Sequence, residues 1–168
     1  MALDTETTGF QKDGGSEELI QIGMKKENGA TLYRFFLPSG PFSESAVKTH
    51  SLTMEKLKKE GAAPFGSADA KDILEFAGPR ALVIMHNKWF DLKVLLKAFK
   101  AAKVHLPLKD ALDPWETRCT QELAKQLDLP ETLEELCTLF SIEQPQAHDA
   151  LADASATLQV WQRLRAAP

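Results

Sequence analysis

Two apolar, strand-like stretches near the start of the chain are separated by a turn signal. Residues 19–24 and 31–37 combine apolar, β-branched and aromatic side chains, and Glu27-Asn28-Gly29 between them is typical of a hairpin turn. A third strand-like run covers residues 81–85, and Leu3 with its neighbours is suited to a short first strand. The chain therefore begins with an antiparallel pair.

Helical spacing dominates the later part of the chain. In residues 90–102, Val94, Leu95 and Phe99 fall on one face of a helix. The same spacing predicts further helices over residues 117–127, 133–140 and 150–165. Two segments rich in helix and strand breakers, residues 38–41 and 61–66, predict loops. An early hairpin followed by alternating strands and helices predicts a single-domain α/β fold, with a mixed sheet covered by helices on both faces.

Length and composition agree with one soluble domain. The 168 residues suffice for one sizeable core, and 43% hydrophobic and 26% charged residues are ordinary values. No stretch approaches the roughly 18 apolar residues of a membrane helix, and no secretory signal opens the chain. Cys119 and Cys137 have neither CxxC spacing nor nearby histidines. This disfavours a disulfide framework or a zinc site and favours a reducing, cytoplasmic setting.

The net charge of −4 differs from the basic balance usual in nucleic-acid binders. It agrees with a nuclease whose carboxylates hold divalent cations, because those cations supply the positive charge that phosphates meet. Composition alone does not choose between these function classes.

An acidic pair stands at the start of the chain, in Asp4-Thr5-Glu6-Thr7-Thr8-Gly9. On a strand, Asp4 and Glu6 project to the same side. Two like charges so close are unfavourable unless a cation lies between them. Taken alone, the pair is equally typical of two solvated acids at a strand end.

Two further polar segments follow predicted elements. His86-Asn87-Lys88-Trp89-Phe90-Asp91 links a strand to a helix, the kind of place where functional groups gather in α/β sheets. His148-Asp149-Ala150-Leu151-Ala152-Asp153 opens the last helix, with Asp149 suited to be its N-cap. In isolation, Asp91 can be a helix-dipole partner. Likewise, the third segment can be a capped helix with one exposed acid and a loop histidine.

In order, the three segments are DxE, HNxxFD and HxxxxD, and this combination resembles the motifs of the DEDDh (DnaQ-like) 3′→5′ exonucleases. That family includes the proofreading (epsilon) subunit of bacterial replicative polymerases. The resemblance runs from Leu3 to about Leu164. It implies a ribonuclease H-like fold with a mixed five-stranded sheet, and one exonuclease domain over residues 1–168.

The resemblance also implies a chemistry. Two divalent ions, Mg²⁺ or Mn²⁺, would be held by four carboxylates. Asp4 would bridge both ions, Glu6 and Asp153 would complete the shell of one, and Asp91 would serve the other. His148 would be the general base, since an imidazole titrates near neutral pH. The family's other branch uses a tyrosine there, but the single tyrosine, Tyr33, lies far from the third motif in sequence.

The substrate implied is the 3′ end of single-stranded DNA or RNA, with a polymerase or another replication or repair protein as a partner. Phe10 would pack against the terminal base, with ordinary core packing as the alternative. His50 would line the same cleft or else lie on the surface. Lys93, Lys97 and Lys100 share a helix face that would track phosphates or simply be solvated. The remaining residues expected at the substrate are Thr7, Gly9 and Asn87.

Two other functions stay open from the residues alone. One is an RNA-trimming exoribonuclease of the same family, since no residue can be shown to read the 2′-hydroxyl. The other is a catalytically silent nucleic-acid-binding domain, which the presence of all five candidate catalytic residues disfavours. Only three residues precede Asp4, fewer than the family's first strand usually has, so we expect a truncated amino terminus.

Overall fold

The computed structural model describes residues 1–108, 114–144 and 146–166. A five-stranded mixed sheet forms its centre, in the order β3-β2-β1-β4-β5. The strands are β1 (Ala2–Thr7), β2 (Leu19–Lys25), β3 (Thr31–Phe35), β4 (Leu82–Met85) and β5 (Glu116–Cys119). β1, β2 and β3 pair antiparallel, whereas β4 pairs parallel with both β1 and β5. The mixed five-stranded α/β sheet expected from the sequence is confirmed.

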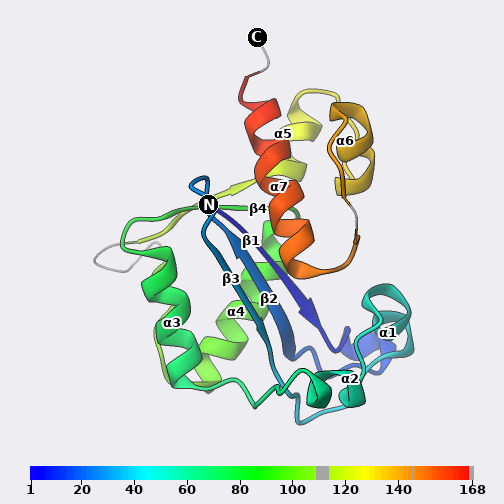
Figure 1. Cartoon of the computed structure of the whole chain (residues 1–168), viewed down its shortest axis with the longest axis vertical. Coiled ribbons are helices and arrows are strands. Elements are labelled where there is room, and N and C mark those ends of the chain that lie inside the picture. Colours follow the sequence, from blue (N-terminus) through cyan, green and yellow to red (C-terminus); the bar gives the residue numbers. More distant parts are fainter. Residues whose placement is uncertain (109–113, 145, 167–168) are drawn as a thin grey trace.

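Helices cover both faces of the sheet, as Figure 1 shows. α7 (Ala150–Leu164) crosses one face, with α5 (Thr120–Gln126) and α6 (Leu133–Phe140) beside it. α4 (Lys88–Ala101) lies behind the sheet on the other face. The remaining helices are the short 3₁₀ helix η1 (Gln11–Asp13), α1 (Glu44–His50), α2 (Met54–Lys59) and α3 (Ser67–Ala77).

The alternation of side chains on β1 assigns its residues to the two faces. Leu3 belongs to the large core under α3 and α4, which also contains Ile73, Leu95 and Phe99. Ala2 instead packs with residues of α7. Asp4 and Glu6 therefore project toward α7, because they share the phase of Ala2 along the strand.

The predicted hairpin is confirmed in its position and its pairing. The N–H of Lys26 donates to the carbonyl of Ala30, and that of Gly29 donates to Lys26, which closes the turn. β2 is buried on both faces, which explains why its sequence is continuously apolar instead of alternating.

One helix prediction was wrong at its start. Residues 117–119 belong to β5, and α5 begins only at Thr120. β4 provides a parallel partner for every residue of β5, so tertiary pairing overrides the helical spacing that continues into α5. The helices predicted over residues 90–102, 133–140 and 150–165 are confirmed to within two residues at each end.

Candidate active site

β1 presents two acids on the face that α7 covers. The register between β1 and β2 is regular through Glu6, opposite Gln21, and shifts before Thr7, which lies opposite Leu19. Such a bulge bends a strand and redirects its side chains. Asp4 and Glu6 are both partly buried, so their carboxylates are partly removed from water.

Asp91 reaches the same region from α4. The helix begins directly after β4, and Asp91 lies in its first turn with a side chain that is 1% exposed. The hydroxyl of Thr5 donates a hydrogen bond of 2.7 Å to its Oδ1. Asp91 is thus held at β1 and is more than a helix-dipole partner at the surface.

The first turn of α7 supplies the fourth acid. Asp149 is the N-cap, as predicted, because its Oδ1 accepts the backbone N–H groups of Leu151 and Ala152. Asp153 is only 7% exposed, so the alternative of an exposed acid is wrong. Its carboxylate accepts hydrogen bonds from Nε2 of Gln144 at 2.6 Å and from the backbone N–H of His148 at 3.1 Å.

The four acids raise one another's pKa values. Burial raises the pKa of Asp4 well above its ordinary value, and the charges of Asp91, Glu6 and Asp153 raise it further. Burial, then the charges of Asp153 and Asp91, raises the pKa of Glu6 to about 8. The pKa of Asp91 also rises to about 8 through burial, although the Thr5 hydrogen bond opposes this. The site therefore concentrates negative charge that is costly without a cation.

The donors present fit a divalent cation. Among the described residues, ligand atoms of Glu6, His148 and Asp153 lie within 4.8 Å of one another. Carboxylate oxygens are the ligands that Mg²⁺ and Mn²⁺ prefer. Asp4 and Asp91 fall outside this tightest group and are linked to it through their electrostatic interactions. His148 is close enough to Glu6 and Asp153 for the three side chains to bind one cation together.

His148 lies at the edge of the acids and faces a cleft. It is exposed and has a left-handed backbone with φ of 62°. A cleft of about 400 Å³ is lined by His148, His50, Lys56 and Tyr33, among others. The exposed imidazole is thus accessible to a molecule that enters the cleft, as a general base has to be.

Tyr33 is far from the third motif in sequence but not in space. It lies on β3, and its hydroxyl donates a hydrogen bond to Oδ2 of Asp149, directly beside His148. The separation in sequence was therefore a wrong guide to the distance between Tyr33 and the third motif, because β3 and the start of α7 meet across β2. Gly23 of β2 makes this meeting possible, since a Cβ there would lie 2.3 Å from atoms of Ala150.

His50 is buried, so a surface role is wrong for it. Its Nδ1 accepts the N–H of Leu52 at 2.9 Å, which leaves Nε2 to donate to the carbonyl of Thr7 at 3.0 Å. Burial lowers the pKa of His50, which favours this neutral form. His50 lines the cleft beside His148 and not the pocket that Phe10 lines, and both of its ring nitrogens are used to hold the end of α1 against β1.

Gly9 and Phe10 form the turn after β1. Gly9 has φ of 90°, and a Cβ would lie 2.0 Å from the hydroxyl oxygen of Ser43, so only glycine fits. Its N–H donates to Oγ1 of Thr7. The turn leaves Phe10 41% exposed, which contradicts ordinary core packing for that ring.

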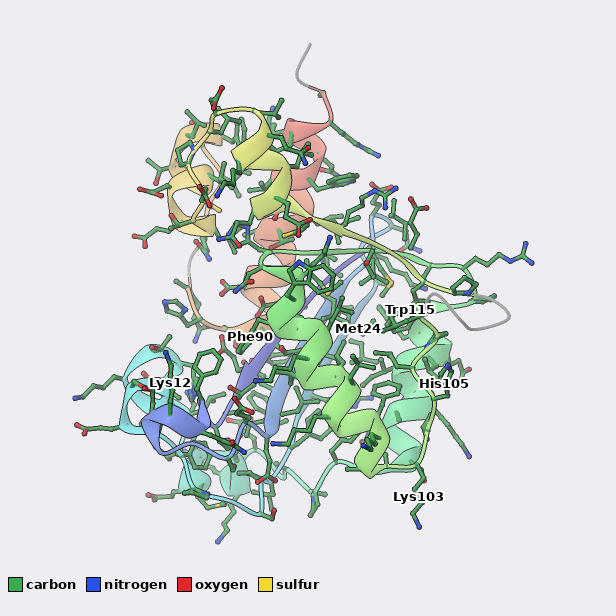
Figure 2. The ribbon with its side chains drawn as sticks, turned by 180° about the vertical axis from the view of Figure 1, so that it is seen from behind. Lys12, Met24, Phe90, Lys103, His105 and Trp115 are labelled. Atoms are coloured by element: carbon green, nitrogen blue, oxygen red, sulfur yellow. The ribbon has the colours of Figure 1, made fainter. Side chains whose placement is uncertain are left out.

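The Phe10 ring lies beside the beginning of α4. It packs edge-on against Phe90, with ring centroids 5.6 Å apart, and Lys12 and Lys93 approach its faces at 5.7 and 6.0 Å. Figure 2 shows Lys12 and Phe90 near each other at this end of α4. An exposed ring flanked by ammonium groups suits a base with its phosphate.

Other expected substrate residues have mixed surroundings. Asn87 is exposed in a left-handed conformation at the N-cap of α4, without a side-chain cap. Lys93 pairs with Glu17 at 2.9 Å, and Lys97 donates to the carbonyl of Ser16 at 2.7 Å. Both lysines are exposed to solvent and also contact the protein, so a role in tracking phosphates and a solvated helix face both stay predictions.

The family model for exonucleases (RNase_T) matches residues 1–161 of the chain, a span that includes all three motifs. The chain belongs to this exonuclease family. The resemblance to DEDDh exonucleases is thereby confirmed.

Relatives of this exonuclease are longer proteins. A candidate bifunctional exonuclease/endonuclease protein of Mycobacterium tuberculosis (strain CDC 1551 / Oshkosh) is 30% identical over 98% of the chain and 26% of the relative. The 3′-5′ exonuclease DinG of Staphylococcus haemolyticus (strain JCSC1435) is 30% identical over 92% of the chain and 17% of the relative. The chain thus spans about a quarter or less of the curated relatives it matches.

The exonuclease also shares its fold with a solved structure. Escherichia coli exonuclease I in complex with a dT13 oligonucleotide superposes with a TM-score of 0.82 at 18% identity, over 98% of this chain and 40% of that one. This likeness confirms the ribonuclease H-like fold. Within the described residues, no helix of the exonuclease combines the length and apolar character needed to cross a membrane.

The motifs omit four side chains that support the acids of this exonuclease. Thr5 and Gln144 donate directly to Asp91 and Asp153. Gln21 and Tyr33 hold Asp149 from the sheet. Only Gln21 carried a signal in the sequence, as an amide within a continuously apolar strand, where a buried polar group needs a partner.

Proposed function

We propose that the chain removes nucleotides one at a time from the 3′ end of single-stranded DNA, with Mg²⁺ or Mn²⁺ as its metal. One observation carries this proposal: acids from β1, α4 and α7 lie close enough to raise one another's pKa values, and the exposed His148 lies at their edge. Family membership and the oligonucleotide complex of exonuclease I support the same substrate class.

Asp4, Glu6, Asp91 and Asp153 would hold two divalent ions. When bound, such ions offset the charge that develops on the entering and leaving oxygens during phosphodiester hydrolysis. The fit rests on the donor set, in which oxygen ligands predominate and burial makes uncompensated negative charge unfavourable.

His148 would act as the general base. Its imidazole accepts one proton from the attacking water, whose oxygen forms the new bond to phosphorus. The bond between phosphorus and the 3′ oxygen of the preceding nucleotide breaks, and that oxygen takes up a proton. The products are a nucleoside 5′-monophosphate and a strand shortened by one nucleotide with a free 3′-hydroxyl.

The terminal base would stack on Phe10. The ring is exposed, lies on the turn after β1, and is flanked by Lys12 and Lys93. Thr7 lines the same small pocket as Phe10. Stacking accepts any base, which suits an enzyme that degrades a strand irrespective of sequence.

The decisive experiment follows label release from matched single strands. DNA labelled at its 3′ end should release labelled mononucleotide at once with Mg²⁺ or Mn²⁺ and none with EDTA, while a 5′-labelled strand shortens stepwise. His148→Ala should slow release roughly 10²- to 10⁴-fold. Cleavage of circular single-stranded DNA, or full activity in EDTA, would contradict the proposal. Faster release from RNA of the same sequence would favour the exoribonuclease.

The length of the relatives indicates how this exonuclease domain would be used. Because the chain matches only a part of each of them, we propose that it works as an exonuclease module alongside other activities. The replication or repair partner and the cytoplasmic setting expected from the sequence stay predictions.

A further inference from the structure

The start of α7 is fastened to the sheet by side chains. The N–H of Ala150 donates to Oε1 of Gln21 at 3.0 Å, and Oδ1 of Asp149 accepts the next two N–H groups. The first three backbone donors of the helix, which have no partner within a helix, are therefore all satisfied. Gln21 lies on β2, so the sheet itself fixes where α7 begins.

The second oxygen of Asp149 is also fully engaged. Oδ2 accepts the hydroxyl of Tyr33 and the Nε2 of Gln21, the latter at 3.1 Å. The same Nε2 donates to the Tyr33 oxygen at 2.7 Å. Tyr33, Gln21 and Asp149 thus form a closed triangle of hydrogen bonds. Asp149 has no lone pair to offer a cation, unlike the four acids of the site.

The backbone of His148 lies between Asp153 and the triangle that holds Asp149. Within the described residues, its hydrogen bond is made by the backbone N–H, which donates to Oδ2 of Asp153. Its φ of 62° is uncommon for a residue with a side chain, so the turn is held by its neighbours. Asp153 holds it on one side, and Asp149, the next residue, holds it on the other.

We propose that Tyr33 is a positioning residue for His148 and acts through Asp149. The inference rests on the proposed role of His148 as general base. Tyr33 extends from β3, a strand that carries none of the five catalytic candidates, and it lines the same cleft as His148. Without that hydroxyl, the turn loses a contact to the sheet, and the imidazole moves relative to the acids.

The test is Tyr33→Phe in the whole chain, which removes only the hydroxyl. We expect kcat on single-stranded DNA with Mn²⁺ to fall roughly 10- to 100-fold, the effect of a displacement of about 1 Å, while KM changes less than about twofold. The matched control is Thr138→Val on α6, which removes a hydroxyl bonded to the Glu134 carbonyl of its own helix. The control should leave kcat and KM unchanged.

A double variant separates positioning from general destabilisation. Tyr33→Phe in a His148→Ala background should cause no further loss, because the residue through which it acts is already absent. In metal-free protein labelled with ¹⁵N at its four histidines, Tyr33→Phe should shift the amide signal of His148. The signals of His86 and His105 should stay in place.

Each other outcome overturns the inference. A normal kcat for Tyr33→Phe, or an unmoved His148 signal, removes Tyr33 from the mechanism and leaves the proposed function intact if His148→Ala is slow. If Tyr33→Phe lowers kcat further in the His148→Ala background, Tyr33 acts on α7 or its acids and not through His148. A fully active His148→Ala contradicts the general base itself and the inference with it.

Discussion

Gly23 lies directly beneath Ala150. A Cβ at position 23 would come within 2.3 Å of the carbonyl carbon and oxygen of Ala150, which are backbone atoms that cannot rotate away. Gly23 is paired with Asp4 on one side and Tyr33 on the other. The residue against which α7 begins is thus the direct cross-strand neighbour of an acid of the site and of the tyrosine that holds Asp149.

Gly23→Ala should therefore lower both stability and activity. We expect the free energy of unfolding to fall by about 1–3 kcal/mol, as in other overpacked sites, and the nucleotide release rate to fall with it. Gly66→Ala is the control, since the new Cβ would meet only the Asp69 carboxylate at 3.7 Å. Denaturant unfolding of both variants measures these free energies. An equal loss in Gly66→Ala would contradict the view that α7 needs a glycine at position 23.

The metal-free protein should become less stable as the pH rises from about 5 to about 8. Folded Glu6 and Asp91 have pKa values of about 8, whereas unfolded carboxyl groups titrate near 4. Between these values the folded state binds more protons, so the free energy of unfolding falls with increasing pH. Melting curves in EDTA across this range measure the slope.

Addition of Mn²⁺ should flatten that slope, because a cation that binds the ionised acids stabilises the folded state most where protons no longer do. A steeper decline with Mn²⁺ than with EDTA would be inconsistent with a cation at these acids.

Asp4→Asn should abolish nucleotide release and yet stabilise the metal-free protein at pH 8. The substitution removes a carboxylate whose pKa is raised by burial and by four neighbouring acids. We expect the melting temperature to rise by several degrees, the equivalent of about 1 kcal/mol for a chain of this length. Glu44→Gln, at an exposed ion pair on α1, should leave both quantities unchanged. A less stable but active Asp4→Asn would remove Asp4 from the site.

Phe10→Ala should weaken binding of single-stranded DNA roughly 5- to 150-fold, the equivalent of about 1–3 kcal/mol, because the terminal base would lose the exposed ring on which it stacks. Stability should change little, since the ring is not in the core. Phe76→Ala removes an α3 ring that Lys26 approaches at 4.7 Å and serves as the control for affinity, which it should leave unchanged. Because Phe76 packs against the core, this control should lower stability, unlike Phe10→Ala. Fluorescence anisotropy and a melting curve read the two effects separately.

The strands and helices with strong periodicity could be predicted from the sequence, and so could the shared orientation of Asp4 and Glu6, because both follow from the spacing of neighbouring residues. β5 could not, since four residues acquire strand structure only from the pairing with β4. Of the side chains that support the site, only Gln21 carried a signal in the sequence, and its partners could not be predicted. Tyr33 and Asp149 meet only because Gly23 lets the start of α7 approach the sheet, a contact between segments that nothing local encodes.

The site is also built from elements at opposite ends of the chain. β1 is the first element of the chain and α7 the last, yet the two pack together and bring Glu6 near Asp153. Because closing the long loop between β1 and α7 costs conformational entropy, we expect the mutual repulsion of these acids to arise late in folding. Cations that bind here would slow unfolding while leaving the refolding rate almost unchanged. Bound cations would thus increase the kinetic stability of the folded protein. Chelation would shorten the lifetime of the folded state without slowing folding.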